Sequence, residues 1–139
     1  LYDEAKKNGW TVISMKNDWK TIFAEGVAFG LRDGLQTLGT PEPALQSLSL
    51  VGGGARDAWW AQLLADALGL PLTLHEGAET GAALGAARLA WLACGASLDE
   101  VCTMPPVSRV FVPDAARHTA LSLRHARFQA LYRALSASF

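Results

Sequence analysis

Residues 48–57 read Leu-Ser-Leu-Val-Gly-Gly-Gly-Ala-Arg-Asp, and this stretch decides the fold of the chain. A short apolar run leads into three glycines, and a segment with helical spacing of apolar residues follows. Glycine has no Cβ, so a ligand can approach its backbone closely and a positive φ costs little. Free N–H groups at the start of the next helix would favour polar or anionic ligands. This order predicts a strand, a glycine turn that seats a nucleotide, and a helix.

The glycine turn departs from two well-known phosphate-binding motifs. No Gly-Lys-Ser/Thr follows at the spacing of a Walker A loop. Asp57 stands where the dinucleotide-binding fingerprint needs its third glycine. Because glycine-rich turns between strands and helices are common, the motif alone leaves a ligand-free connection equally open.

Length and composition indicate one globular domain. The chain has 139 residues, of which 50% are hydrophobic and 18% charged, and its net charge is −1. This balance gives no argument for nucleic acid or anionic membrane as a partner. Residues 82–94, the most apolar stretch, are too short to span a bilayer. The two cysteines and three histidines lack metal-binding spacing, so we expect a cytoplasmic protein without metal ligands.

The N-terminal third contains one possible strand and one helix. Residues 10–15, Trp-Thr-Val-Ile-Ser-Met, read as a possible strand, and residues 16–18 as a turn. Apolar residues at three- and four-residue steps predict a helix over residues 22–38, ended by Gly39. Three glycines share one face of this helix and predict close packing there: Gly26, Gly30 and Gly34.

The middle of the chain predicts a βαβ unit. Residues 45–51 form the first strand, a helix follows from Ala58, and Gly69 ends it. Residues 70–74 form the second strand, with Pro71 near its beginning. The spacing predicts that the two strands pair in parallel.

The last third predicts three helices and an edge strand. Thr80 is the expected N-cap of a helix that ends near Cys94. The many small residues of this helix would let other backbone or a flat ligand come close, but they equally predict a helix that is simply buried against the sheet. Ser97 and Glu100 form a capping-box pattern, and residues 107–112 read as an edge strand. Asp114 then caps a final helix, whose expected apolar stripe consists of Leu121, Phe128, Leu131 and Leu135.

Four segments, in order, resemble the FGGY family of carbohydrate kinases. Residues 25–34 are similar to the family's E-G-(V/I)-A-(F/Y)-x-L-x-D helix, and residues 51–56 to its adenosine motif. Residues 81–87 are similar to its closing G-x-A-x-G-A-A helix. The tail, Phe-x-Pro-Asp at 111–114 with Phe-x-x-Leu-Tyr at 128–132, resembles the xylulose kinase branch. The resemblance covers residues 22–139.

This resemblance implies an α/β fold, part of an actin/hexokinase-like (ribonuclease H-like) ATPase domain with a short mixed sheet packed by helices. Residues 21–139 would be the C-terminal part of the nucleotide-binding domain. Residues 1–20 do not resemble the family and would be a tag, a splice or a divergent segment. The implied reaction converts D-xylulose and ATP to D-xylulose 5-phosphate and ADP with Mg²⁺.

The resemblance also implies which residues lie against the adenosine end of ATP. These are Gly52, Gly53, Gly54, Ala55, Arg56 and Asp57. The charge of Asp57 would sit near an anionic ligand, which puts its direct contact in doubt. The family's catalytic aspartate, sugar-binding residues and first phosphate loop have no counterpart here, so the chain alone is expected to be inactive.

Two other functions remain open, and one assembly state is expected. The chain could be a nucleotide-binding module without catalysis, because actin-like folds serve several functions, or a folded chimeric fragment with no ligand. A half-domain should also expose apolar surface, expected around Trp10, Trp19 and Phe29, and this predicts a homo-oligomer.

Overall fold

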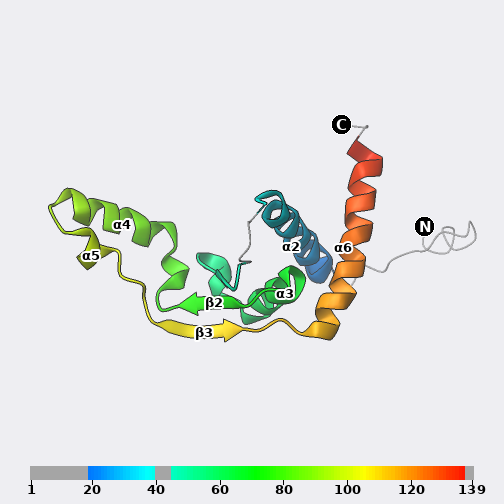
Figure 1. Cartoon of the computed structure of the whole chain (residues 1–139), viewed down its shortest axis with the longest axis horizontal. Helices are drawn as coiled ribbons and strands as arrows, with labels where there is room; N and C mark the ends of the chain where they lie inside the picture. Colours follow the sequence, from blue (N-terminus) through cyan, green and yellow to red (C-terminus); the bar gives the residue numbers. More distant parts are fainter. Residues whose placement is uncertain (1–18, 40–44, 137–139) are drawn as a thin grey trace, which may run out of the picture.

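The computed structural model describes residues 19–39 and 45–136 of the chain. The strand predicted at residues 10–15 and the turn predicted at 16–18 therefore lie outside the described residues. Within them, ten elements follow in chain order, from helix α2 to helix α6 (Figure 1).

A three-stranded mixed sheet holds the elements together. Strand β1 (Leu48–Ser49) runs parallel to β2 (Leu72–His75), and β3 (Val107–Phe111) pairs antiparallel with the other edge of β2. The predicted βαβ unit and edge strand are confirmed. The first strand is shorter than the predicted residues 45–51, and the chain turns sharply at Gly52, where φ is 90°.

Helix α3 (Ala58–Leu68) is the crossover between the parallel strands and supplies more core residues than any other element. It buries Ala61, Leu63, Leu64, Ala65 and Ala67. The helix ends at Gly69 with φ of 70°, as predicted. A Cβ at Gly69 would also lie 2.6 Å from the His118 ring, so both backbone conformation and packing require glycine there.

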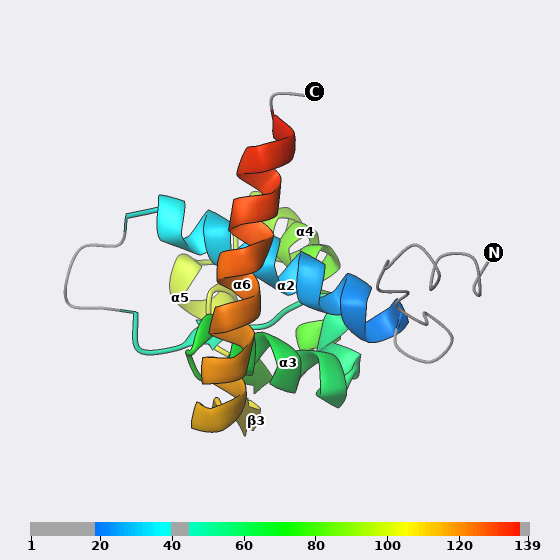
Figure 2. The ribbon, with the colours of Figure 1, turned by 90° about the vertical axis from the view of Figure 1, so that its right-hand side faces the viewer.

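Helices α2 (Trp19–Thr37) and α6 (Ala115–Leu135) both pack against α3 (Figures 1 and 2). Phe29 joins them to each other, because its ring centroid lies 5.7 Å from that of Phe128 and 5.4 Å from that of His125. Phe29 is only 4% exposed, so the expectation that it belongs to an exposed apolar patch is wrong.

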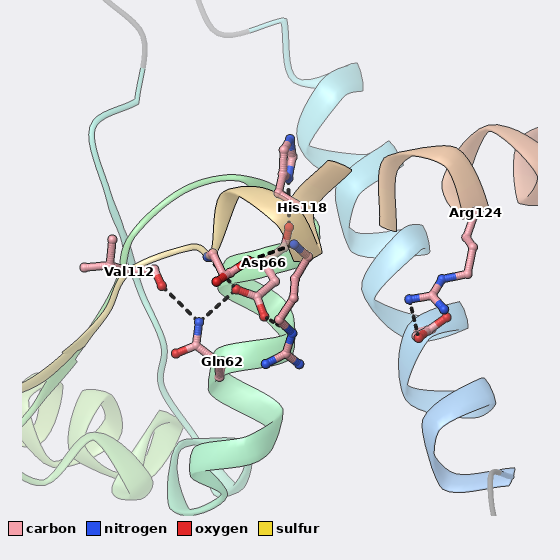
Figure 3. Close-up of polar contacts among 8 residues, drawn as sticks. Gln62, Asp66, Val112, His118 and Arg124 are labelled. Carbon is pink, nitrogen blue, oxygen red and sulfur yellow. Dashed lines mark hydrogen bonds and ion pairs between the residues drawn. The ribbon is translucent and has the colours of Figure 1, made fainter. Parts of the chain in front are cut away.

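A buried carboxylate fixes the start of α6 to α3 (Figure 3). Asp66 is fully buried, and its Oδ1 accepts hydrogen bonds from Gln62 Nε2 at 2.8 Å and from the Asp114 N–H at 2.9 Å. Its Oδ2 has no well-aligned hydrogen bond, but the Nε of Arg117 lies 3.1 Å away as an ion pair. The predicted N-cap of α6 is confirmed, since the Asp114 side chain accepts from Arg117 N–H.

Helices α4 (Ala82–Ala93) and α5 (Leu98–Val101) form an arm at the opposite end of the molecule from α6 (Figure 1). No residue of α4 is buried by the described part of the chain, so the predicted burial of this helix against the sheet is wrong. Thr80 is not its N-cap. Thr80 lies in the short 3₁₀ helix η2 (Ala78–Thr80), its hydroxyl donates to Gly77 O, and Gly81 precedes α4 without a side-chain cap.

Two further expectations about helix faces are wrong. A Cβ at Gly26, Gly30 or Gly34 would meet nothing within 4 Å among the described residues, so this face of α2 is not closely packed by them. Leu131 and Leu135 are 59% and 45% exposed, so only the first half of the predicted α6 stripe faces the core.

The capping box at α5 is confirmed and perturbs one carboxyl group. Glu100 accepts from the Ser97 backbone N–H and hydroxyl, both at 2.9 Å, and these bonds lower the pKa of Glu100 below its ordinary value. A lowered folded-state pKa means that the box stabilises α5 above the pKa of the unfolded chain. That stabilisation is lost as the pH falls through the folded-state pKa.

We expect Ser97→Ala to raise the pKa of Glu100 part of the way toward its ordinary value, because the hydroxyl bond is lost while the backbone N–H bond, the larger cause, remains. Side-chain carboxyl NMR titration of the parent chain and the variant would measure it. Asp99→Asn, next to the box and without a role in it, is the control and should leave Glu100 unchanged. An unaltered Glu100 titration in Ser97→Ala would show that the Ser97 hydroxyl does not bond Glu100 in solution.

Candidate nucleotide site

The glycine turn leaves the sheet through one residue that only glycine accommodates easily. Gly52 has φ of 90° and ψ of −171°. The next residues form a 3₁₀ helix, η1 (Gly53–Arg56), closed by hydrogen bonds from Ala55 N–H to Gly52 O at 3.0 Å and from Asp57 N–H to Gly54 O at 3.2 Å. Of the three glycines, only Gly52 therefore uses the positive φ that the sequence led us to expect of the turn.

A second glycine turn meets the first, backbone against backbone. The Gly52 N–H donates to Ala78 O at 2.7 Å. A Cβ at Gly81 would lie 3.1 Å from the Gly52 Cα, and Gly81 itself has φ of 46°. Two of the family-like segments, residues 51–56 and 81–87, are thus brought together, although sequence reasoning did not include Gly81 among the site residues.

An indole ring supports the first turn from the α3 side. A Cβ at Gly54 would lie 3.0 Å from Trp60 Nε1 and 3.1 Å from Trp60 Cδ1. Trp60 is half-buried and packs against the core. Sequence reasoning placed Trp60 only in the apolar stripe of α3. Apart from its position in the first turn of α3, directly after the glycine turn, nothing in the sequence indicates that Trp60 contacts Gly54.

Asp57 caps helix α3 and occupies the first N–H groups of that helix. Its Oδ1 accepts from Trp59 N–H at 2.9 Å and from Trp60 N–H at 3.2 Å. These donors are therefore not free for a ligand, and the carboxylate opposes an anion at this point. The expectation that free N–H groups at this helix start would attract an anion is wrong.

The other predicted site residues differ in how far they are exposed. Ala55 is half-buried and packs against the core. Arg56 is exposed at the end of η1, and Gly53 is exposed with nothing within 4 Å of a Cβ position. Gly53 and Arg56 thus expose backbone and one positive charge on the open face of the turn, although neither of them lines the pocket described below.

A pocket of about 350 Å³ opens beside the junction of the two glycine turns. Its walls come from the ends of β1 and β2, from η2, from the first turns of α4 and from the segment before β3; they include Val51, Ala78, Gly81, Leu84, Gly85 and Met104. Two polar side chains at its edge are engaged, since His75 Nδ1 lies 2.8 Å from Pro105 O and Arg88 donates to Thr103 O at 2.6 Å, and the exposed Glu76 also lines it. Mostly apolar walls suit a flat, uncharged group better than phosphates.

The described residues do not supply a metal site. Among residues 19–39 and 45–136, no three His, Cys, Asp or Glu side chains lie together as a metal would require. In the same part of the chain, no helix has the length and apolarity needed to cross a membrane. This part of the chain therefore offers no cluster of side chains that could hold a metal ion by itself.

Comparison with known proteins identifies a kinase family. Residues 13–94 match the C-terminal domain of the FGGY family of carbohydrate kinases. The chain is 39% identical to a xylulose kinase of Escherichia coli over 121 residues, which is 86% of the chain and 25% of that protein. It is 31% identical to a glycerol kinase of Streptococcus sanguinis over 128 residues, 90% of the chain and 24% of that protein.

Solved structures give the same result for the fold. The crystal structure of a xyloylose kinase from Brucella ovis superposes with a TM-score of 0.72 at 37% identity, over 91% of the chain and 27% of that protein. The chain thus spans about a quarter of the length of these relatives. The family match begins at residue 13, inside the segment predicted to be unrelated, and the boundary at residue 20 stays a prediction.

Proposed function

Because this chain belongs to the FGGY family of carbohydrate kinases through their C-terminal domain, we propose that it is the adenosine-binding part of an ATP-dependent sugar kinase. The site residues would be those of the glycine turn, with Gly53 and Arg56 facing the ligand. Gly52 and Gly54 would shape the turn, and Asp57 would hold the start of α3.

One observation carries this proposal. The two glycine turns meet at Gly52 and Gly81 without any side chain between them, beside a mostly apolar pocket. Backbone free of side chains, next to an apolar pocket, suits a nucleoside, whose base is flat and whose ribose is small. The capped start of α3 argues against phosphates at this point, which favours the adenosine end of ATP.

The parent reaction would transfer the γ-phosphoryl group of ATP to a sugar hydroxyl. The oxygen of that hydroxyl bonds to phosphorus, the bond to the β-phosphate oxygen breaks, and a base takes the hydroxyl proton. The name xylulose kinase, shared by several relatives, supports D-xylulose as the sugar and D-xylulose 5-phosphate as the product. We assign the base, the sugar site and the Mg²⁺ site to parts of the parent protein outside this chain.

We expect the isolated chain to show no kinase activity with ATP, Mg²⁺ and D-xylulose. A coupled assay for ADP should give only background, because binding one end of one substrate does not place reacting groups together. Turnover on the order of 1 s⁻¹ or faster would be typical of a complete enzyme and would overturn the assignment of the base elsewhere.

Assembly and location follow from the same proposal. Large apolar side chains are exposed on α2, α4 and α6, which supports self-association of the isolated chain. Light scattering at micromolar concentration should therefore find a dimer or larger species, and a clean monomer would contradict this.

ATP as substrate and two exposed free cysteines, Cys94 and Cys102, support a cytoplasmic protein.

The second candidate is a nucleotide-binding module without catalysis. It is favoured by the same junction of glycine turns, which needs no catalytic group. A parent protein that binds ATP but transfers no phosphoryl group to any pentulose would support it over the kinase.

A further inference from the structure

The indole ring of Trp60 brings a hydrogen-bond donor without a protein partner to the glycine turn. The ring nitrogen Nε1 carries a proton and can only donate. The backbone N–H of Trp60 donates to Asp57 Oδ1, whereas no residue in the described part of the chain accepts from the indole N–H. Because buried tryptophan N–H groups usually find a partner, this donor calls for an explanation.

Solvent reaches the indole N–H of Trp60. Within residues 19–39 and 45–136, Asp66 Oδ2 is the one side-chain nitrogen or oxygen that is closed off from solvent without a hydrogen bond. Trp60 is half-buried, and its Nε1 also lacks a hydrogen bond, so this atom lies open at the surface. A ligand can therefore reach a donor that no described protein group uses.

Gly54 leaves this donor uncovered. Its φ is not positive, so its backbone conformation is open to any residue. A Cβ at Gly54 would lie 3.0 Å from Trp60 Nε1 and 3.1 Å from Trp60 Cδ1, and would meet no other described residue within 4 Å besides its chain neighbours. A side chain at position 54 would thus cover the N–H edge of the indole, and glycine keeps that edge open on the exposed surface of the turn.

The charge beside Trp60 indicates which kind of ligand atom fits the donor. The carboxylate of Asp57 bonds the backbone N–H groups of Trp59 and Trp60, and it opposes an anionic oxygen at this end of α3. An uncharged acceptor is therefore preferred. In a nucleoside whose base occupies the apolar pocket beside Gly81, the ribose follows the base toward the glycine turn, and its hydroxyl oxygens are uncharged acceptors.

We propose that the indole N–H of Trp60 donates to a ribose hydroxyl oxygen of the bound nucleoside, across the space left by Gly54. This inference rests on the proposed function and adds a side-chain donor to a site otherwise formed by backbone and Arg56. It also makes the ribose, and not only the base, a part of what the turn recognises.

The indole N–H signals of the five tryptophans, observed by NMR in the full 139-residue chain, test this contact. With several millimolar adenosine we expect the Trp60 signal to shift. Adenine and inorganic triphosphate at the same concentration lack the ribose and should leave it in place. The signal of Trp59 is the internal control, because this neighbouring side chain lines a separate pocket with Thr21 and Arg117.

Trp60→Phe should weaken adenosine binding about threefold or more, because phenylalanine keeps an aromatic ring but cannot donate a hydrogen bond. Trp59→Phe is the matched control and should bind adenosine as the parent chain does. Slow amide exchange at Ala65, which is buried in α3, reports whether each variant stays folded. Should Trp60→Phe lose that protection, the Trp60 signal of the parent chain decides alone.

Two results would overturn this contact and leave the adenosine site in place. In the first, adenosine shifts the Gly53 amide but not the Trp60 indole signal. In the second, a folded Trp60→Phe binds adenosine as tightly as the parent chain. A Trp60 shift that adenine or triphosphate reproduces in full would also overturn it, because the acceptor would then belong to the base or the phosphates. If neither adenosine nor ATP shifts any signal of the two glycine turns, the proposed function itself fails, and this contact with it.

Discussion

Replacing Asp66 with alanine is expected to lower the free energy of unfolding by about 3 kcal/mol, the range for losing charge-assisted hydrogen bonds in a buried site. Asp66 is fully buried and holds Gln62 Nε2 and the Asp114 N–H through one oxygen. Its removal leaves the Asp114 N–H without this acceptor at the junction of β3 and α6. Urea unfolding monitored by circular dichroism measures the change in the free energy of unfolding. It is read from the shift of the unfolding midpoint, provided that the dependence of the free energy on urea concentration is the same in both proteins.

Arg117→Ala is the matched control, because it removes the ion pair but leaves both hydrogen bonds of Asp66. The Arg117 side chain is 52% exposed, and solvent screens such a pair to less than about 1 kcal/mol. A loss as large as that of Asp66→Ala would mean that the ion pair, and not the hydrogen bonds, fixes α6. Equal and negligible losses would mean that α6 is held by its apolar contacts alone.

Replacing Gly53 with valine should abolish nucleotide binding while the chain stays folded. Gly53 has no positive φ and nothing within 4 Å of a Cβ, so the protein itself tolerates a side chain there. The valine would project from the open face of the turn, where the proposed ligand lies. We expect at least a tenfold loss of ATP affinity, about 1.4 kcal/mol, in an NMR titration.

Gly26→Val is the control for this variant, since Gly26 also has no positive φ and no atom near a Cβ, but lies on α2. It should bind ATP as the parent chain does. Gly54→Val is a weaker test, although the sequence points equally to it, because its Cβ would press on Trp60 and disturb the fold. Wild-type affinity in a folded Gly53→Val would show that the ligand does not use this face.

The parts of the fold that were predicted correctly depend on local chemistry. Gly69 ends α3, Asp114 caps α6, and Ser97 with Glu100 caps α5, because each device needs only residues a few positions apart. The parallel pairing of β1 and β2 was also predicted correctly, because two strands joined by one helix at this spacing usually lie side by side and run in the same direction.

The parts that were missed depend on contacts between distant residues. Small residues in α4 are compatible with burial, but burial needs a covering element, and none of the described residues provides one. Asp66 reads as one polar residue in an apolar stripe, and only the fold brings it to Asp114. At the candidate site, the glycine turn was predictable, whereas its supports, Trp60 and Gly81, required the three-dimensional arrangement.

The central claim, that the glycine turn seats the adenosine end of ATP, is tested most directly by NMR titration of the parent chain with ATP to several millimolar. We expect binding in the millimolar range, about −4 kcal/mol, because the phosphates lack partners here. Backbone amide shifts should concentrate at Gly53, Arg56 and Gly81, and adenosine alone should reproduce most of them. No shifts, or shifts confined to residues away from the two glycine turns, would contradict the account.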